Sequence, residues 1–435
     1  MADDSELSIL TSVKARVDKI TIDGLKKTKD SLMVNMVQNK FKNVNNFQDM
    51  LLEAYEVKDR LSSLGIFSRV GISIDTIRDD ESSIGYEVIY NVEEKGHLSG
   101  KISTTVENND GALVLKSEVP NLFGRAEKLS IEYQVSKRAR KGINIDLKAP
   151  LKPWTYHNPV ITTSIFQNYT DKPWSGFHQV DRGLLSDLSF NSFADINHSF
   201  RWAGIWREIQ TTGSSFQIRE QSGHSLKSSI FHTMTLDRRD GPLLPNLGYL
   251  VRLNQEYAGL GGDTNFFKHE LQISQSIPLV SNISVEGSIK AGLMNSSSSI
   301  ADRFFLGGPM SLRGFKMNGV GPHSEGNALG STTYWIAGLH LYAPLPFKKT
   351  HSLENWLKAH FFLNAGNIGN FSFNGDSVKY FNNLLNRVRL SAGFGIVVSF
   401  LSLARLELNY CVPLSLQPGD RPDRRFQFGI GFEYV

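Results

Sequence analysis

The chain has 435 residues, of which 40% are hydrophobic and 21% are charged, with 37 glycines and a single cysteine. Its 47 basic and 43 acidic side chains leave a formal net charge of +4, which gives no support to a nucleic-acid partner. The lone Cys411 excludes an intramolecular disulfide framework and a thiolate-rich zinc site. The first residues, MADDSELSIL, lack the basic and apolar regions of a secretory signal, so we expect none. No run approaches the roughly 18 apolar residues of a spanning helix, which leaves a soluble protein or a β-barrel.

Residues 17–95 have the pattern of a small α/β unit that follows an N-terminal tail, residues 1–16. Alternating apolar residues predict one strand at its start and two at its end, and apolar residues at helical spacing predict two helices between them. The positions that carry these predictions are Ile20 and Ile22, Thr28 as a candidate cap of the first helix, Asn46 at the start of the second helix, and residues 70–74 and 86–92. The order β-α-α-β-β suffices for one sheet with two packed helices.

From residue 97 to residue 435 the hydrophobic pattern has a period of two. A soluble sandwich gives the same alternation, but many of these runs reach roughly 9 to 11 residues, the length of a transmembrane strand. The expected fold is therefore mostly β, with a 16-stranded antiparallel transmembrane β-barrel after the N-terminal unit. We place the strands near 98–107, 111–119, 126–136, 141–149, 159–169, 183–193, 196–208, 225–236, 247–258, 266–277, 282–294, 331–343, 357–365, 387–399, 403–411 and 425–434.

The longest gap between predicted strands, residues 295–330, is glycine-rich and apolar and carries Arg313 near its middle. Its aromatic and aliphatic side chains need burial, so we expect a loop, residues 301–322, that folds back into the barrel lumen. There the guanidinium would need a carboxylate, backbone carbonyls or an aromatic face. A surface loop with an incidental arginine is the alternative.

Several motifs, in the same order along the chain, resemble the outer-membrane β-barrel assembly superfamily. The hydrophobic-Arg-Gly-aromatic motif of loop six in that superfamily matches Leu312, Arg313, Gly314 and Phe315. Residues 17–95 resemble its polypeptide-transport-associated (POTRA) domain, and residues 121–125 resemble its turn between the second and third strands. One POTRA-like unit, sixteen strands and the lack of a signal are similar to the mitochondrial branch, the sorting and assembly machinery.

The resemblance implies a partner for Arg313 on strand thirteen of the barrel. The matching segment consists of Phe362, Asn364 and Gly366, with asparagine where bacterial relatives carry aspartate. A salt bridge at that position is therefore not expected. A neutral hydrogen bond from Asn364, or pairing of Arg313 with Glu286 or Glu407, would replace it.

The last predicted strand resembles the β-signal of mitochondrial barrel precursors, polar-x-Gly-x-x-hydrophobic-x-hydrophobic. The matching residues are Gln427, Gly429, Phe432 and Tyr434. Many amphipathic strands fit this pattern, and its position at the end of the sequence is what gives it weight.

The function implied by the resemblance is that of a core insertase, which folds β-barrel precursors by adding strands at the seam between its first and last strands. The alternatives are a protein-translocating or passive metabolite channel of an outer membrane, and a soluble β-rich protein. We assign no catalytic residue, no cofactor and no metal, so we do not expect an enzyme.

The resemblance also implies where the chain lies and what it contacts. It implies a multi-pass β-barrel in the mitochondrial outer membrane, with the N-terminal unit in the intermembrane space. The implied partners are unfolded mitochondrial β-barrel precursors, the peripheral cytosol-facing subunits of the sorting and assembly machinery, the lipid bilayer and, as a further candidate, an inner-membrane complex that organises cristae. We expect no nucleic-acid partner.

Overall fold

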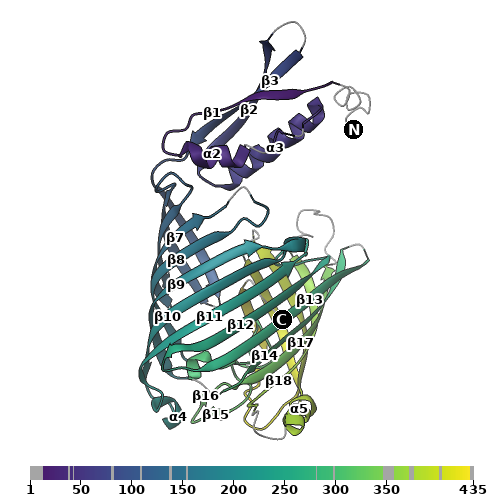
Figure 1. Ribbon diagram of the computed structural model, residues 1–435. Helices are drawn as coiled ribbons and strands as arrows, with labels where there is room; N and C mark the ends of the chain where they lie inside the picture. The colour runs from purple at the N-terminus through teal and green to yellow at the C-terminus, as the bar shows by residue number, and fades with distance from the viewer. Residues whose placement is uncertain are drawn as a thin grey trace.

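The chain forms a small N-terminal unit above a large barrel (Figure 1). The computed structural model describes residues 13–37, 40–42, 44–79, 83–107, 110–136, 140–152, 155–280, 282–296, 299–345, 357–371, 377–400 and 404–431. Within these ranges, no helix is both long enough and apolar enough to span a membrane.

The N-terminal unit has the predicted order of elements. Its elements are β1 (Arg16–Asp23), α2 (Asp30–Val37), α3 (Phe47–Ser63), β2 (Phe67–Asp79) and β3 (Ser83–Glu94). The central strand, β3, runs parallel to β1 and antiparallel to β2. The helix α3 begins where the side chain of Asn46 accepts a hydrogen bond of 2.7 Å from the backbone of Asp49. Its apolar face, which includes Met50 and Leu61, is buried against the sheet.

Thr28 has a different role from the predicted helix cap. The helix α2 begins at Asp30, and both the backbone N–H and the hydroxyl of Thr28 donate to Glu94 Oε1, at 2.9 and 2.5 Å. The backbone N–H groups of Lys26 and Lys27 donate to the same carboxylate. Burial of Glu94 raises its pKa, but these hydrogen bonds outweigh burial, so the pKa of this carboxyl is held below its usual range.

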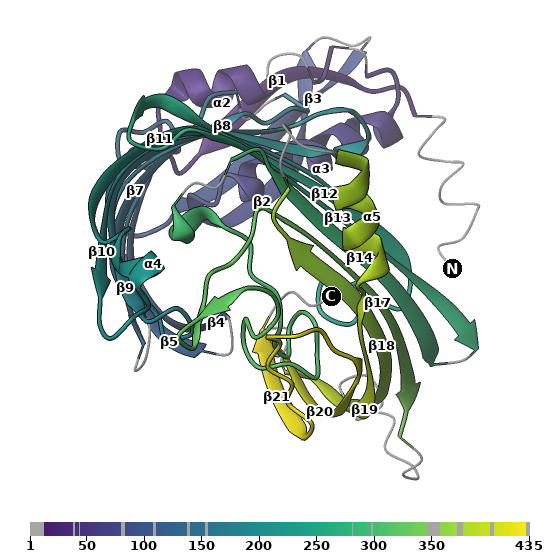
Figure 2. The ribbon, with the colours of Figure 1, turned by 90° about the horizontal axis from the view of Figure 1, so that it is seen from below.

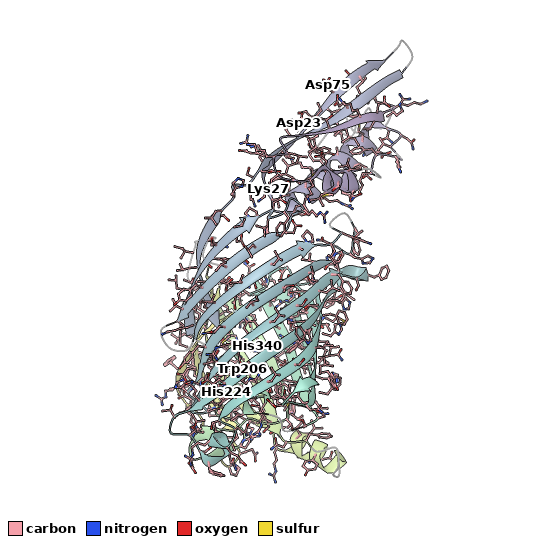
Figure 3. All side chains as sticks on the ribbon, turned by 60° about the vertical axis from the view of Figure 1, so that its left-hand side comes forward. Asp23, Lys27, Asp75, Trp206, His224 and His340 are labelled. Carbon is pink, nitrogen blue, oxygen red and sulfur yellow. The ribbon has the colours of Figure 1, made fainter. Side chains whose placement is uncertain are left out.

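The turn between β5 (Asp110–Pro120) and β6 (Lys128–Ser136) joins the barrel to the N-terminal unit. Asn121 Nδ2 donates to the hydroxyl of Thr28 at 2.7 Å, and the backbone N–H of Lys29 donates to the carbonyl of Gly124 at 2.8 Å. Ala126 of the same turn is buried in the apolar core of the N-terminal unit. Lys27, labelled in Figure 3, lies at this junction. The turn is therefore bonded to the N-terminal unit at several points.

The barrel is a sheet of sixteen antiparallel strands that follow one another in chain order, as predicted. The strands besides β5 and β6 are β4 (Ser99–Glu107), β7 (Arg140–Pro150), β8 (Val160–Lys172), β9 (Phe177–Asn191), β10 (Asn197–Thr211), β11 (Gly223–Asp237), β12 (Gly248–Gly262), β13 (Phe266–Val280), β14 (Ile283–Met294), β17 (Thr333–Pro344), β18 (Leu357–Gly369), β19 (Arg389–Phe400), β20 (Ala404–Ser415) and β21 (Phe426–Gly431). Along β10 the large Trp202 and Trp206 are exposed on the outer face, whereas Arg207 is buried on the lumenal face. Trp206 also donates to His224 of β11 on this outer face (Figure 3).

The strand boundaries differ most from prediction before residue 222. The strand β9 begins at Phe177 instead of residue 183, because its ladder with β10 continues through polar residues that break the apolar alternation. Short elements that the sequence pattern did not predict lie at the barrel end away from the N-terminal unit (Figure 1). These are α4 (Phe216–Arg219), a 3-10 turn (Ile300–Asp302), β15 (His323–Ser324), β16 (Asn327–Ala328) and α5 (Ser377–Asn386), and a further 3-10 turn (Phe193–Asp195) links β9 to β10.

A chain that lacks residues 1–95 is expected to keep a folded barrel. The N-terminal unit has its own sheet and core, so we expect it to be a separate cooperative unit, and the loss is confined to the contacts of Asn121, Gly124 and Ala126. Heat-modifiable migration in a gel measures barrel folding. A truncated chain without such migration would show that the two parts fold together.

Candidate functional site

The chain between β14 and β17, which we call loop six, lies inside the barrel. Figure 2, which looks along the barrel from the end that carries α5, shows this segment within the ring of strands. The side chains of Leu312, Arg313 and Phe315 are fully buried there. The apolar cluster that holds the loop against the inner wall contains Phe304, Leu306, Leu312, Phe315 and Val320 of the loop, with Ala258, Phe266, Met294, Tyr334, Ile336 and Ile368 of the wall.

Arg313 is held by an amide and a carboxylate on different strands. Its Nη2 and Nε lie 3.0 and 3.1 Å from Glu407 Oε2 on β20, and its Nη1 donates to Asn364 Oδ1 on β18 at 3.3 Å. The guanidinium carbon lies 5.3 Å from the centre of the Phe362 ring. Of the three partners considered from the sequence, Asn364 and Glu407 both contact Arg313, whereas Glu286 accepts a hydrogen bond from Tyr342. The neutral amide thus supplies geometry, and Glu407 supplies the compensating charge.

Glu407 is the centre of a larger buried network. It pairs with Arg405 on the same strand as well as with Arg313, and it accepts 2.8 Å from Asn409 Nδ2. Asn409 Oδ1 lies 2.9 Å from His360 Nδ1, which continues the network towards β18. A buried network of this kind is stable while each member keeps its partner, and it is costly when one partner is removed.

A second ion cluster anchors the start of loop six to the opposite side of the barrel. The carboxylate of Asp302 lies 2.9 Å from Arg207 Nη1 and 2.8 Å from Lys227 Nζ, on β10 and β11. Lys227 also pairs with Glu256, and Lys268 donates to the backbone carbonyl of Asp302 at 2.7 Å. Burial of Asp302 raises its pKa, but the two cations outweigh burial and lower the pKa to about 2. The sequence reasoning gave these residues no role, although strand alternation places Arg207 and Lys227 on the lumenal face.

The loop-six motif also contacts the last strand. The backbone N–H of Gly314, whose φ is +83°, donates to Gln427 Oε1 at 3.0 Å, and Gln427 Nε2 donates to the carbonyl of Phe315 at 2.8 Å. Further along β21, a Cβ atom on Gly431 would come within 2.0 Å of Met310 Cε. The structure thus joins two motifs that are far apart in the sequence, because one side chain of β21 bonds two backbone groups of loop six.

The other predicted site residues lie as follows. Gly366 pairs with Ile336 in the ladder between β18 and β17, and Gly429 is buried on the lumenal face of β21. Phe432 and Tyr434 lie outside the described residues. Among the described residues, no cluster of three or more potential ligands could hold a metal ion.

The seam between the first and last barrel strands differs from all other strand neighbours. The last strand, β21, has 6 residues, against 9 in β4 and up to 15 elsewhere. It forms a ladder with β20, but no ladder joins it to β4 within the described part of the chain. The outer edge of β4 therefore presents backbone donors and acceptors without strand partners in this structure.

The order of the strands, the lumenal loop with its arginine and the seam allow comparison with known proteins. A profile of the Omp85 superfamily domain matches residues 121–434. The chain belongs to the Omp85 superfamily.

The Omp85 relatives include the sorting and assembly machinery component 50 homologs of Bos taurus and Homo sapiens. They are 37% and 36% identical to this chain, over 99% of it and 93% of their own length in both cases. In fold, the chain is similar to the crystal structure of BamA from Haemophilus ducreyi lacking POTRA domains 1–3, with a TM-score of 0.75 and 18% identity. That alignment covers 95% of this chain and 84% of the BamA chain.

Replacing Gln427 by leucine is expected to loosen β21 and loop six in this Omp85 chain. The change leaves the buried N–H of Gly314 and the carbonyl of Phe315 unpaired, at a cost of roughly 1 to 3 kcal/mol for each such group. Limited proteolysis of residues 416–425 measures the loosening. Gln427→Glu keeps the acceptor and should be intermediate, and Phe428→Leu on the exposed face is the control. Equal cleavage of all three variants and the unmodified chain would contradict the clamp.

Proposed function

We propose that this chain folds and inserts β-barrel precursor proteins into the mitochondrial outer membrane. Its relatives are named components of a sorting and assembly machinery, and its fold is that of the Omp85 superfamily, which support a role in barrel assembly. The observation that carries the mechanism is the seam, where β4 has a free edge and the neighbouring strand β21 is short.

Strand addition at this edge requires no covalent step. An unfolded precursor strand forms ladder hydrogen bonds with β4, which satisfies the backbone groups of both strands in a lipid environment. The driving force is burial of the precursor's apolar face in the hydrocarbon region. Neither a nucleotide nor a catalytic residue enters this mechanism.

Loop six supports this mechanism from inside the barrel. Asp302 ties its start to β10 and β11, Arg313 ties its middle to β18 and β20, and Gln427 joins it to β21. The last strand is thereby held by β20 and by the loop, and its position does not depend on pairing with β4. The edge of β4 can remain open to a precursor while the rest of the barrel keeps its shape.

The experiment that tests the seam is a disulfide cross-link to an arrested precursor. The buried Cys411 is replaced by serine, and Ile102→Cys places a thiol on the exposed face of β4. We expect a cross-link to a cysteine in the last strand of a mitochondrial porin precursor. The matched control is Ile165→Cys, which is also exposed, on β8. Equal cross-linking at both positions, or none at position 102, would overturn strand addition and favour the channel alternative.

We also propose that the N-terminal unit lies in the intermembrane space. It follows directly onto β4 through residues 95–98, too short a connection to cross a bilayer. Protease added to intact mitochondria should spare an N-terminal epitope, and it should remove the epitope after the outer membrane is ruptured. Removal from intact organelles would place the unit on the cytosolic side.

A further inference from the structure

The helix α5 is an amphipathic segment at the barrel end away from the N-terminal unit (Figure 1). Its last turn is bonded to two side chains on the outer face of the barrel. Trp335 Nε1 and Asn367 Nδ2 donate to the carbonyl of Leu384 at 3.1 and 2.7 Å. At its start, Tyr380 lies edge-on to Phe371, with ring centres 6.5 Å apart. These contacts hold the helix beside the outer wall.

A cavity of about 830 Å³ lies between α5 and this wall. Its floor includes Leu271, Ala291 and Leu293 of β13 and β14, and its cover includes Tyr380 and Leu384. The floor residues belong to the outer face. Ala291 pairs with Trp335, and Leu271 is 42% exposed, whereas the neighbouring Met294 and Tyr334 are buried on the lumenal side. The cavity is therefore apolar and opens on the surface that faces hydrocarbon in a membrane.

One end of the cavity is cationic. Arg387 and Arg389 both line it, directly after α5. Arg389 is already paired, because its Nε lies 2.9 Å from Asp420 Oδ2. Arg387 is exposed, and within the described part of the chain no hydrogen bond or ion pair engages it. Its charge is thus available to an anionic group at the end of the cavity.

We propose that this cavity binds a glycerophospholipid, with an acyl chain under α5 and the phosphate at Arg387. The apolar floor lies on the lipid-facing side, and the cavity lies near the strand ends at Leu293, Thr333 and Gly369, where lipid headgroups begin. Trp335 and Tyr380 are residue types typical of that level of the bilayer. A ligand that is apolar along its length and anionic at one end complements both features.

The test uses the full chain in nanodiscs of phosphatidylcholine that contain a trace of phosphatidylcholine with a photoreactive group on one acyl chain. After illumination, we expect adducts concentrated in peptides that contain Ala291, Leu293 and Leu384. Ala291→Trp fills the floor and should lower adduct yield there at least fivefold. The matched control is Ala343→Trp, on the same outer face of β17 but outside the cavity, and it should leave the yield unchanged.

The headgroup is tested separately. Arg387→Gln should lower the yield at these peptides, whereas Arg424→Gln, another exposed arginine outside the cavity, should not. A diacylglycerol with the same photoreactive group lacks the phosphate and should label at least fivefold less. Equal labelling by the diacylglycerol would overturn the role of Arg387.

Labelling spread evenly over the outer wall and unaffected by Ala291→Trp would show ordinary bilayer contact and overturn the site. Heat-modifiable migration verifies that each variant is folded. Leu293→Phe replaces Ala291→Trp if the latter does not fold, since it narrows the same cavity by a smaller change.

Discussion

Replacing Arg313 by alanine is expected to release the middle of loop six from the inner wall and to slow precursor assembly strongly. The change leaves Glu407 with Arg405 as its charged partner and removes the donor to Asn364. Breaking a fully buried ion pair typically costs roughly 3 to 5 kcal/mol. From the sequence alone a smaller loss is expected, because Asn364 replaces an aspartate. The contact with Glu407 raises that expectation, since both side chains are completely buried.

Two measurements check this result. Tryptic cleavage after the exposed Lys316 should rise on the order of 100-fold if the loop opens that much more easily. Assembly of a radiolabelled mitochondrial porin precursor, followed on native gels, should slow in parallel.

Arg313→Lys should be nearly as damaging as alanine, because an ammonium cannot bond Glu407 and Asn364 with the geometry of the planar guanidinium. Glu407→Gln should share most of the defect of Arg313→Ala, so the double variant should be far less impaired than the sum of the two. If Arg313→Ala assembles the precursor at the unmodified rate and at normal protein levels, the arginine is an incidental lumenal charge.

Replacing Asp302 by asparagine is expected to release the other end of loop six. The carboxylate neutralises Arg207 and Lys227 together, and the change leaves both cations buried with less compensation. Glu256 still pairs with Lys227 and Asp181 still lies 3.4 Å from Arg207, so we expect a cost near the lower end of the roughly 3 to 5 kcal/mol for a broken buried pair.

The measurement is again cleavage of loop six together with precursor assembly. Glu325→Gln is the matched control, because Glu325 is an exposed acid of the same loop. Unchanged cleavage in Asp302→Asn would show that the apolar cluster alone holds this part of the loop.

The pH dependence has a defined sign. The pKa of Asp302 is lowered in the folded chain to about 2, so its contribution is complete above the unfolded value near 4 and is lost as pH falls towards 2. Loop cleavage by an acid-stable protease should therefore rise over that interval in the unmodified chain. The Asp302→Asn variant should show a flatter response.

The sequence by itself determined the architecture. The period-two pattern, long strand lengths and even strand count predicted a 16-stranded barrel, and helical spacing around Asn46 predicted the helices of the N-terminal unit. These features are local, since each depends on which face of a strand or helix a side chain occupies. The same alternation hid the start of β9, where polar residues continue the ladder.

The partners of the buried charges were decided by the tertiary structure. Arg313 lies 94 residues from Glu407 in the sequence and Asp302 lies 95 residues from Arg207, so no local spacing relates them. Their contact depends on how far loop six reaches across the lumen, which the packing of Phe304, Phe315 and their neighbours sets. The bond between Gln427 and Gly314 has the same origin, because barrel curvature brings the last strand to the loop. Local pattern gives a side chain its face, and closure of the barrel gives it its partner.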